Sequence, residues 1–248
     1  MLVHLALFSG SLLLGPPPPQ RLELSFAPAY AQAPEGRDHP SLAYQRVRLQ
    51  AGLAYTADTR HTLYLAIPVV FARHESPQGI EYRHGDLGDA HIGATRWLDP
   101  RWHMGLEFSI PLTRDLDADT YAQSAPQMPT LDEGRLGMRL DGGWTQRTER
   151  FAVDFTVGAA IGLDSISLAP LARASGSLVL LDDALEAGAF ADGRWGLEDG
   201  DDRWLRVGLV ERIGPRVGLS GEIVASTILA ARNTEAATEA GVRIVWRR

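Results

Sequence analysis

The sequence predicts an all-β protein, an antiparallel transmembrane β-barrel of about 12 strands. Two features carry this prediction. Apolar and polar residues alternate with a period of two through most of the chain, and short links alternate with longer polar links between the alternating segments. A period of two places successive side chains on opposite faces of a strand. Glycines spread through the same segments argue against helices, which tolerate glycine poorly.

The strand pattern is clearest in residues 102–112, where Trp102, Leu106 and Phe108 fall on one parity and Glu107 falls on the other. The same alternation predicts further strands at residues 46–55, 62–71, 90–98, 135–144, 151–161, 172–181, 185–197, 204–213, 217–227 and 236–246. Single-chain bacterial barrels have an even number of strands. We therefore expect a twelfth strand, with a barrel of about ten strands as the alternative if two weak segments merge.

The links between these segments form a second pattern. Short links are predicted at residues 57–59, 99–101, 147–150, 182–183 and 214–215, and longer ones at 74–89, 113–133, 164–170, 198–202 and 229–235. Short turns at one end and long loops at the other are typical of outer-membrane barrels. Strands of about 9–11 residues are also long enough for a tilted membrane crossing.

The N-terminus has features of a secretory signal peptide. Residues 5–14 are apolar, and the small residues within 29–33 fit a signal peptidase site. We expect residues 1–33 to be the signal peptide and residues 34–248 to form a single domain. Residues 21–30 also alternate, however, and are an alternative candidate for the missing strand.

Composition excludes several classes of protein. The chain has 248 residues, 45% hydrophobic and 22% charged, as in folded proteins of one or two domains. The absence of cysteine excludes disulfides, thiolate metal sites and a cysteine nucleophile. A formal net charge of −7 argues against nucleic acid as a partner, because binding to phosphates needs a basic surface.

Residue types on the two faces predict which face points outward. The polar parity is rich in small residues, with arginines and carboxylates interspersed in near-equal numbers. Such a face suits a crowded lumen of paired charges, since an unpaired buried charge is costly. Aromatic residues near the ends of the apolar faces, such as Tyr55, Trp102 and Trp246, are typical of membrane-interface girdles. The charged residues that we expect to line the lumen are Arg46, Arg48, Glu107, Arg135, Arg139, Asp141, Asp154, Arg173, Glu186, Asp192, Arg194, Arg206, Glu222, Glu239 and Arg243.

One stretch resembles a known family. Residues 85–98 (GDLGDAHIGATRWL) and 105–112 (GLEFSIPL) resemble a loop-and-strand element of outer-membrane proteins of the phenol-degradation MetA-type family. Those proteins are transporter-like β-barrels, so the resemblance implies passage of hydrophobic or aromatic small molecules across the outer membrane. The C-terminus departs from many such barrels, because Arg247 and Arg248 follow the final aromatic residue, Trp246.

Two groups of residues resemble metal-binding sites, but another interpretation fits each group better. His84, His91 and His103 could be grouped with Asp86 and Asp89, but we expect His84 in a loop and the other histidines in a polar lumen. The acidic residues Asp115, Asp117 and Asp119 begin like a calcium loop that lacks its glycine and its final glutamate. Together with Glu198, Asp199, Asp201 and Asp202 they are better interpreted as acidic outer loops that could recruit cations bridging lipopolysaccharide phosphates. We expect no metal and no cofactor.

Catalysis is also not expected. Ser109 and His103 share one parity of a predicted strand, which places them about 20 Å apart, too far for proton transfer. The chain has no Gly-x-Ser-x-Gly elbow and no phosphate-binding glycine loop. The sequence therefore predicts no catalytic residue.

These observations predict a monomeric outer-membrane barrel of a Gram-negative bacterium, exported by its signal peptide and serving passive uptake of small molecules. Its expected partners are the lipid bilayer, lipopolysaccharide, the outer-membrane assembly machinery and an unidentified small-molecule cargo. A lumen crowded with charges suggests a narrow or plugged pore. Hydrophobic cargo could then leave the barrel sideways, into the lipid. Two alternatives remain: a structural or adhesive envelope barrel without transport, and a secreted soluble β-barrel that binds a ligand internally.

Overall fold

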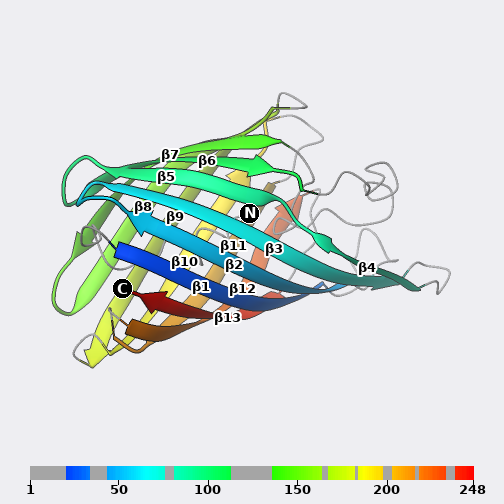
Figure 1. Ribbon diagram of the computed structural model, residues 1–248. Coiled ribbons are helices and arrows are strands. Elements are labelled where there is room, and N and C mark those ends of the chain that lie inside the picture. The colour runs from blue at the N-terminus through cyan, green and yellow to red at the C-terminus, as the bar shows by residue number, and fades with distance from the viewer. Residues whose placement is uncertain are drawn as a thin grey trace.

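The protein is an all-antiparallel β-barrel in the computed structural model, which describes residues 21–33, 44–75, 81–112, 136–163, 167–181, 184–197, 203–215, 218–232 and 238–248 (Figure 1). Its strands are β1 (Arg21–Ala33), β2 (Tyr44–Thr56), β3 (His61–Glu75), β4 (Glu81–Leu87), β5 (Ala90–Trp97), β6 (Trp102–Ile110), β7 (Gly137–Arg147), β8 (Phe151–Gly162), β9 (Ser167–Leu181), β10 (Leu185–Trp195), β11 (Arg203–Ile213), β12 (Gly218–Arg232) and β13 (Thr238–Arg247). Strands that follow one another in the chain pair with each other, except that β4 and β5 both pair with β3, and β13 pairs with β1 to close the cylinder. Within these ranges, no helix is long and apolar enough to span a membrane.

Two of the strand segments form a single crossing of the barrel wall. β4 pairs with the part of β3 from Val69 to Glu75, and β5 pairs with the part from His61 to Ala66. Gly88 lies between them and stays attached to β3, because its N–H donates to the carbonyl of Pro68 at 2.9 Å. The thirteen segments therefore make twelve crossings, which confirms the predicted all-β barrel of twelve strands.

The strands extend further than the alternation predicted at one end of the barrel. The expected loop at residues 74–89 contains β4, and the expected loops at 164–170 and 229–235 contain the start of β9 and the end of β12. The segment Glu81–Leu87 has no apolar alternation, so its strand character comes from its pairing with β3. Interpreting it as a loop was wrong for that reason.

The barrel begins earlier than the expected boundary at residue 33. β1 covers Arg21–Ala33 and pairs with β2 along thirteen residue pairs as well as with β13. The small residues that suggested a cleavage site belong to a row of inward-facing alanines, Ala27, Ala29 and Ala31, which are buried against the interior. Residues 1–20 lie outside the described ranges, so a signal peptide there stays a prediction, and its cleavage has to precede Arg21 for β1 to be retained.

Both chain ends of the described barrel lie at the end that carries the short turns. Arg21 pairs with Thr56 beside the β2–β3 turn, and Arg248 exchanges two backbone hydrogen bonds of 3.0 Å with Leu22. Asp58 and Asp99 cap two of these turns, each accepting bonds from two backbone N–H groups at 2.6–2.9 Å. The turns are thus specified by local side-chain chemistry.

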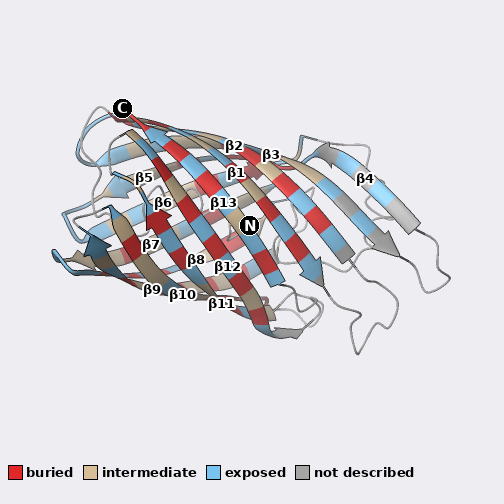
Figure 2. Cartoon of the chain, turned by 90° about the horizontal axis from the view of Figure 1, so that it is seen from below, coloured by how far each residue is buried: buried red, intermediate tan, exposed pale blue. Residues whose placement is uncertain are grey.

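The two faces of the wall have opposite polarity, and the polar face is the buried one (Figure 2). Large apolar side chains such as Phe155 and Leu209 are 49% and 66% exposed on the outside. Charged side chains such as Arg48 and Glu186 are 1% and 0% exposed on the inside. A water-soluble barrel has the reverse arrangement, whereas a membrane barrel turns its apolar face to lipid. The predicted outward orientation of the apolar faces is confirmed.

Candidate functional site: the charged inner wall

The inner wall contains most of the charged residues that the sequence singled out. Twelve of them are buried: Arg46, Arg48, Glu107, Arg139, Asp154, Arg173, Glu186, Asp192, Arg206, Glu222, Glu239 and Arg243. Asp141 and Arg194 are half-buried on the same face. Arg135 lies outside the described residues. A role for these side chains in the passage of a solute stays a prediction.

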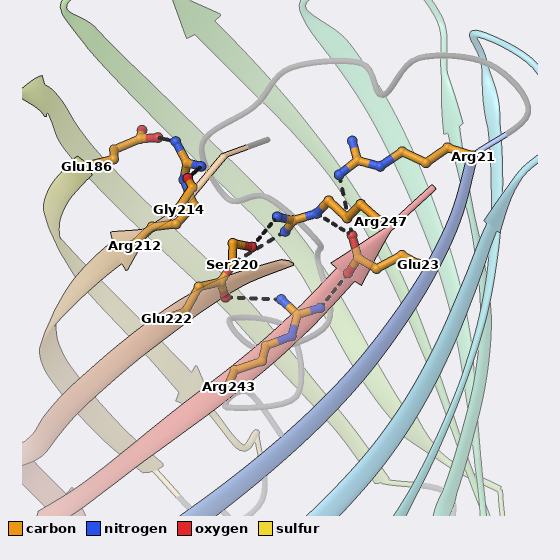
Figure 3. Close-up of polar contacts among 9 residues, drawn as sticks. All are labelled: Arg21, Glu23, Glu186, Arg212, Gly214, Ser220, Glu222, Arg243 and Arg247. Atoms are coloured by element: carbon orange, nitrogen blue, oxygen red, sulfur yellow. Dashed lines mark hydrogen bonds and ion pairs between the residues drawn. The ribbon is translucent and has the colours of Figure 1, made fainter. Parts of the chain in front are cut away.

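An ion-pair cluster joins the first strand of the barrel to the last two (Figure 3). Arg243 lies 2.6 Å from Glu23 and 3.1 Å from Glu222, while Arg247 lies 2.9 Å from Glu23 and 3.4 Å from Glu222. Each carboxylate therefore contacts two guanidinium groups. Arg247 also donates to the hydroxyl of Ser220 at 2.8 Å. We call these five residues the seam cluster, because they lie where β13 meets β1 and β12.

A second cluster surrounds Glu186, near the short-turn end of β10. Arg212 on β11 lies 3.2 Å from its carboxylate, and Arg147 on β7 lies 3.4 Å away. Ser177 on β9 donates to the same carboxylate at 2.6 Å. Arg212 also donates to the carbonyl of Gly214 at 3.0 Å (Figure 3). The Arg147 contact reaches from β7 to β10, so these side chains connect strands that are not neighbours in the sheet.

A third group lies on β9, β10 and β11. Arg206 makes a two-point contact with Asp192, with distances of 3.0 Å and 2.7 Å. Its guanidinium also lies 5.6 Å from the ring centres of both Phe190 and Trp204. Arg173 lies over the same Phe190 ring at 5.0 Å. One aromatic ring thus positions two inward-facing guanidinium groups.

The wall formed by β3, β5 and β6 carries a histidine–carboxylate pair. The Nδ1 atom of His91 lies 3.3 Å from Glu107, and the hydroxyl of Tyr64 donates to the same carboxylate at 2.7 Å. Ser109 donates to Asp89 at 3.2 Å. These hydrogen bonds connect neighbouring strands on the inner face, and each one joins two polar side chains.

The histidine group considered as a metal site is separated in the described part of the chain. His91 contacts Glu107, whereas the ring of His103 lies 4.9 Å from the ring of Trp97. His84 lies in β4 and not in a loop, which corrects its expected position. The described residues contain no group of three side chains placed to hold a metal ion. The acidic segments at residues 115–119 and 198–202 lie outside the described ranges.

Sequence reasoning missed several charged residues of the inner wall. Arg212 shares the parity of Arg206, and Arg247 shares that of Arg243, so the alternation alone could have identified both. Glu23 was assigned to the signal peptide. Assigning residues 21–33 to the barrel would have placed its carboxylate on the inner face.

The outer face has a shallow groove of about 710 Å³. It lies in the part of the wall whose inner face carries the Phe190 side chain. Its lining includes Ala174, Ala189 and Ala225, small side chains where most of the outer surface has leucine, valine or phenylalanine. The strands remain hydrogen-bonded through this region, so the groove is a depression in the lipid-facing surface and not an opening in the wall.

Comparison with known proteins gives a structural likeness only. No protein-family model and no curated protein sequence matches the chain. The COG4313 outer-membrane channel of Pseudomonas putida F1 superposes with a TM-score of 0.72 at 12% identity, over 94% of this chain and 97% of that one. The translocator domain of the autotransporter NalP of Neisseria meningitidis gives 0.62 at 12% identity, over 97% and 92%. The β-domain of the Bordetella autotransporter BrkA gives 0.54 at 9% identity, over 92% and 99%. The strand pairing and these structural neighbours show that the chain has the fold of a closed twelve-stranded antiparallel β-barrel, the fold that these outer-membrane proteins have.

Proposed function

We propose that this protein is an outer-membrane channel of a Gram-negative bacterium through which small molecules cross passively. The observation that carries the proposal is the inversion of polarity: charged side chains line the inside of a closed barrel whose outside is apolar. The likeness to a channel from Pseudomonas putida supports it. Autotransporter domains share the fold, so the fold alone does not select this function.

The outer face supports a position in the membrane. Apolar side chains exposed around the whole barrel are costly in water and favourable in hydrocarbon. Exposed aromatic side chains gather near both ends of the strands, with Tyr55 and Trp102 beside the short turns and Phe71 and Trp195 towards the opposite end. Such girdles are found at the two membrane interfaces. The bilayer, lipopolysaccharide and the barrel-assembly machinery are the partners that this position implies.

The inner face is compatible with transport. This wall carries buried arginines and carboxylates on most of its strands, and membrane channels of this architecture have a polar interior. The electrostatic field of those charges would act on polar and ionised solutes inside the barrel. The resemblance of residues 85–112 to transporter-like barrels implies hydrophobic or aromatic cargo. We therefore propose small organic molecules as the cargo, with their polar parts in contact with the charged wall.

The test begins with the folded state and its location. Protein extracted in detergent from outer membranes is expected to migrate faster on a gel before boiling than after it, and to stay in the membrane after a carbonate wash. Release by carbonate would support the secreted soluble barrel instead.

The folded protein is then added to planar lipid bilayers and to liposomes loaded for a swelling assay. Discrete conductance steps and solute uptake are expected, with boiled protein as the control. A folded barrel that gives neither would favour the structural or adhesive alternative and overturn the proposal.

A further inference from the structure

Two arginines on the inner wall are positioned by the same aromatic ring. Arg173 and Arg206 lie over Phe190 with distances of 5.0 Å and 5.6 Å from their Cζ atoms to the ring centre. Both residues are register partners of Asp192, Arg173 from β9 and Arg206 from β11. Two positive charges therefore flank one carboxylate in a single row across three strands.

Asp192 forms hydrogen bonds with one of these two arginines, Arg206. Its two oxygens accept bonds from Nε and Nη2 of Arg206 at 3.0 Å and 2.7 Å, which is the two-point arrangement that guanidinium and carboxylate groups favour. The nearby carboxylate of Asp154 accepts from Thr145 at 2.6 Å and from Thr156 at 3.1 Å. Asp192 and Asp154 are therefore both near enough to act electrostatically on Arg173, yet neither carboxylate forms a hydrogen bond with it.

Arg173 is buried without a hydrogen-bond acceptor among the described residues. Its side chain is 4% exposed, and its Nε, Nη1 and Nη2 atoms have no hydrogen-bond partner. Nearby buried donors are in the same condition, namely Nη1 of Arg206, the hydroxyl of Ser175 and the indole N–H of Trp204. Buried polar groups in native proteins nearly always have a partner, and a buried charge without one is costly. These unused donors around a buried guanidinium lack an acceptor, and an oxyanion is the acceptor that a guanidinium group binds best.

We propose that Arg173, with Ser175, Trp204 and Nη1 of Arg206, forms an oxyanion-binding site on the inner wall, for the carboxylate or phosphate group of a small solute. We call these four residues the Arg173 site. The planar fork of Arg173 matches two oxygens of a carboxylate or phosphate, and Phe190 holds the fork in place. The site deepens the proposed channel function and rests on it, since a solute in the lumen would pass this wall.

Binding is measured first, on folded full-length protein in detergent, because this needs no conductance. Isothermal titration with sodium acetate and with inorganic phosphate, at constant chloride, is expected to show saturable binding of one or both anions. Arg173→Gln removes the charge and is expected to weaken that binding at least tenfold. Arg173→Lys keeps the charge but loses the fork, so it is expected to recover little of the loss. Arg60→Gln, in the exposed β2–β3 turn, removes the same charge elsewhere and should bind like the wild type.

The outcomes separate the site from the channel. The relative affinities for acetate and phosphate identify which oxyanion the site takes. Absence of saturable binding of either anion, or equal binding by Arg173→Gln and wild type, would overturn the site. A gel comparison before and after boiling shows that each variant is folded. In planar bilayers, acetate is expected to reduce the single-channel chloride current of the wild type and not of Arg173→Gln. Protein that binds acetate but never conducts would overturn the channel function and leave the site supported.

Discussion

The Nη2 atom of Arg243 lies 2.6 Å from Oε1 of Glu23, although 220 positions separate the two residues in the chain. Glu23 belongs to β1 and Arg243 to β13, so this ion pair crosses the line where the cylinder closes (Figure 3). Closure depends on the pairing of these two strands, which no local turn supports. The seam cluster therefore adds side-chain contacts between β1 and β13, the paired strands that no turn connects.

Glu23→Gln is expected to destabilise the barrel by on the order of 3 kcal/mol, because breaking a buried ion pair leaves charges without compensation. In this case Arg243 and Arg247 would share the single carboxylate of Glu222. The measurement is the free energy of unfolding in urea, from the conversion of the fast-migrating to the slow-migrating band. Glu149→Gln is the matched control, since Glu149 is exposed in the turn between β7 and β8. Equal stability of the two variants would show that the seam cluster does not stabilise closure.

Leu209→Arg tests the lipid-facing side of the wall. Leu209 is 66% exposed on the outer face, near the middle of β11. An arginine near the bilayer midplane is expected to cost about 2–4 kcal/mol of unfolding free energy in lipid vesicles. In a soluble barrel the same exposed substitution would have little effect. Thr59→Arg, in the exposed β2–β3 turn, is the control and should stay within about 0.5 kcal/mol of the wild type. A neutral effect of Leu209→Arg would contradict membrane insertion.

The alternation of side chains predicted the barrel and its polarity because each crossing must satisfy lipid on one face and a polar interior on the other. The alternation failed to identify strand residues that do not have a lipid-facing apolar side. Glu81–Leu87 extends the sheet without an apolar face, so only its pairing with β3 identifies it as a strand. The alternation also predicted that Arg206 and Asp192 face inward, but not that they contact each other. That pairing depends on register across strands, which period-two alternation leaves undetermined.

The placement of β1 makes a prediction about processing. N-terminal sequencing of the mature protein from outer membranes is expected to start at or before Arg21, because later cleavage would remove part of β1. Deletion of residues 21–33 would leave β2 and β13 without their shared neighbour and remove Glu23 from the seam cluster. The deleted chain is expected to lose the fast-migrating band completely. A mature chain that starts at Pro34 and still shows that band would contradict the role of β1.

The Asp58 carboxylate gives a pH dependence outside the membrane-spanning strands. A side-chain hydrogen bond with His61, followed by backbone N–H bonds, lowers the pKa of Asp58 from 3.8 to about 2. A lowered pKa means that the charged form stabilises the turn above about pH 4, and that this stabilisation is lost as the pH falls from 4 towards 2. Carbon-detected NMR titration of the side chain measures the pKa. Substitution His61→Ala is expected to move it back towards 3.8, whereas an unchanged value would assign the shift to the backbone bonds.

Gly93 lets Tyr64 cross β5 to reach Glu107. The three residues are register partners on β3, β5 and β6, and the Tyr64 hydroxyl donates to Glu107 at 2.7 Å. A Cβ at position 93 would overlap the Tyr64 ring, so Gly93→Ala is expected to displace the ring and break this bond. Hydrogen bonds to charged groups contribute about 1.5–3 kcal/mol, so Gly93→Ala should lose at least as much unfolding free energy as Tyr64→Phe.

A double-mutant cycle separates the steric effect from a general effect of alanine in a strand. When Tyr64 is already alanine, the Gly93→Ala change is expected to cost little, because no ring remains to be displaced. Gly221→Ala is the control, since a Cβ there would meet nothing within 4 Å. The free energy of unfolding in urea is measured for all four members of the cycle. Additive effects would show that Gly93 is not required for the Tyr64 contact, and would remove the physical reason for a glycine at this position of the inner wall.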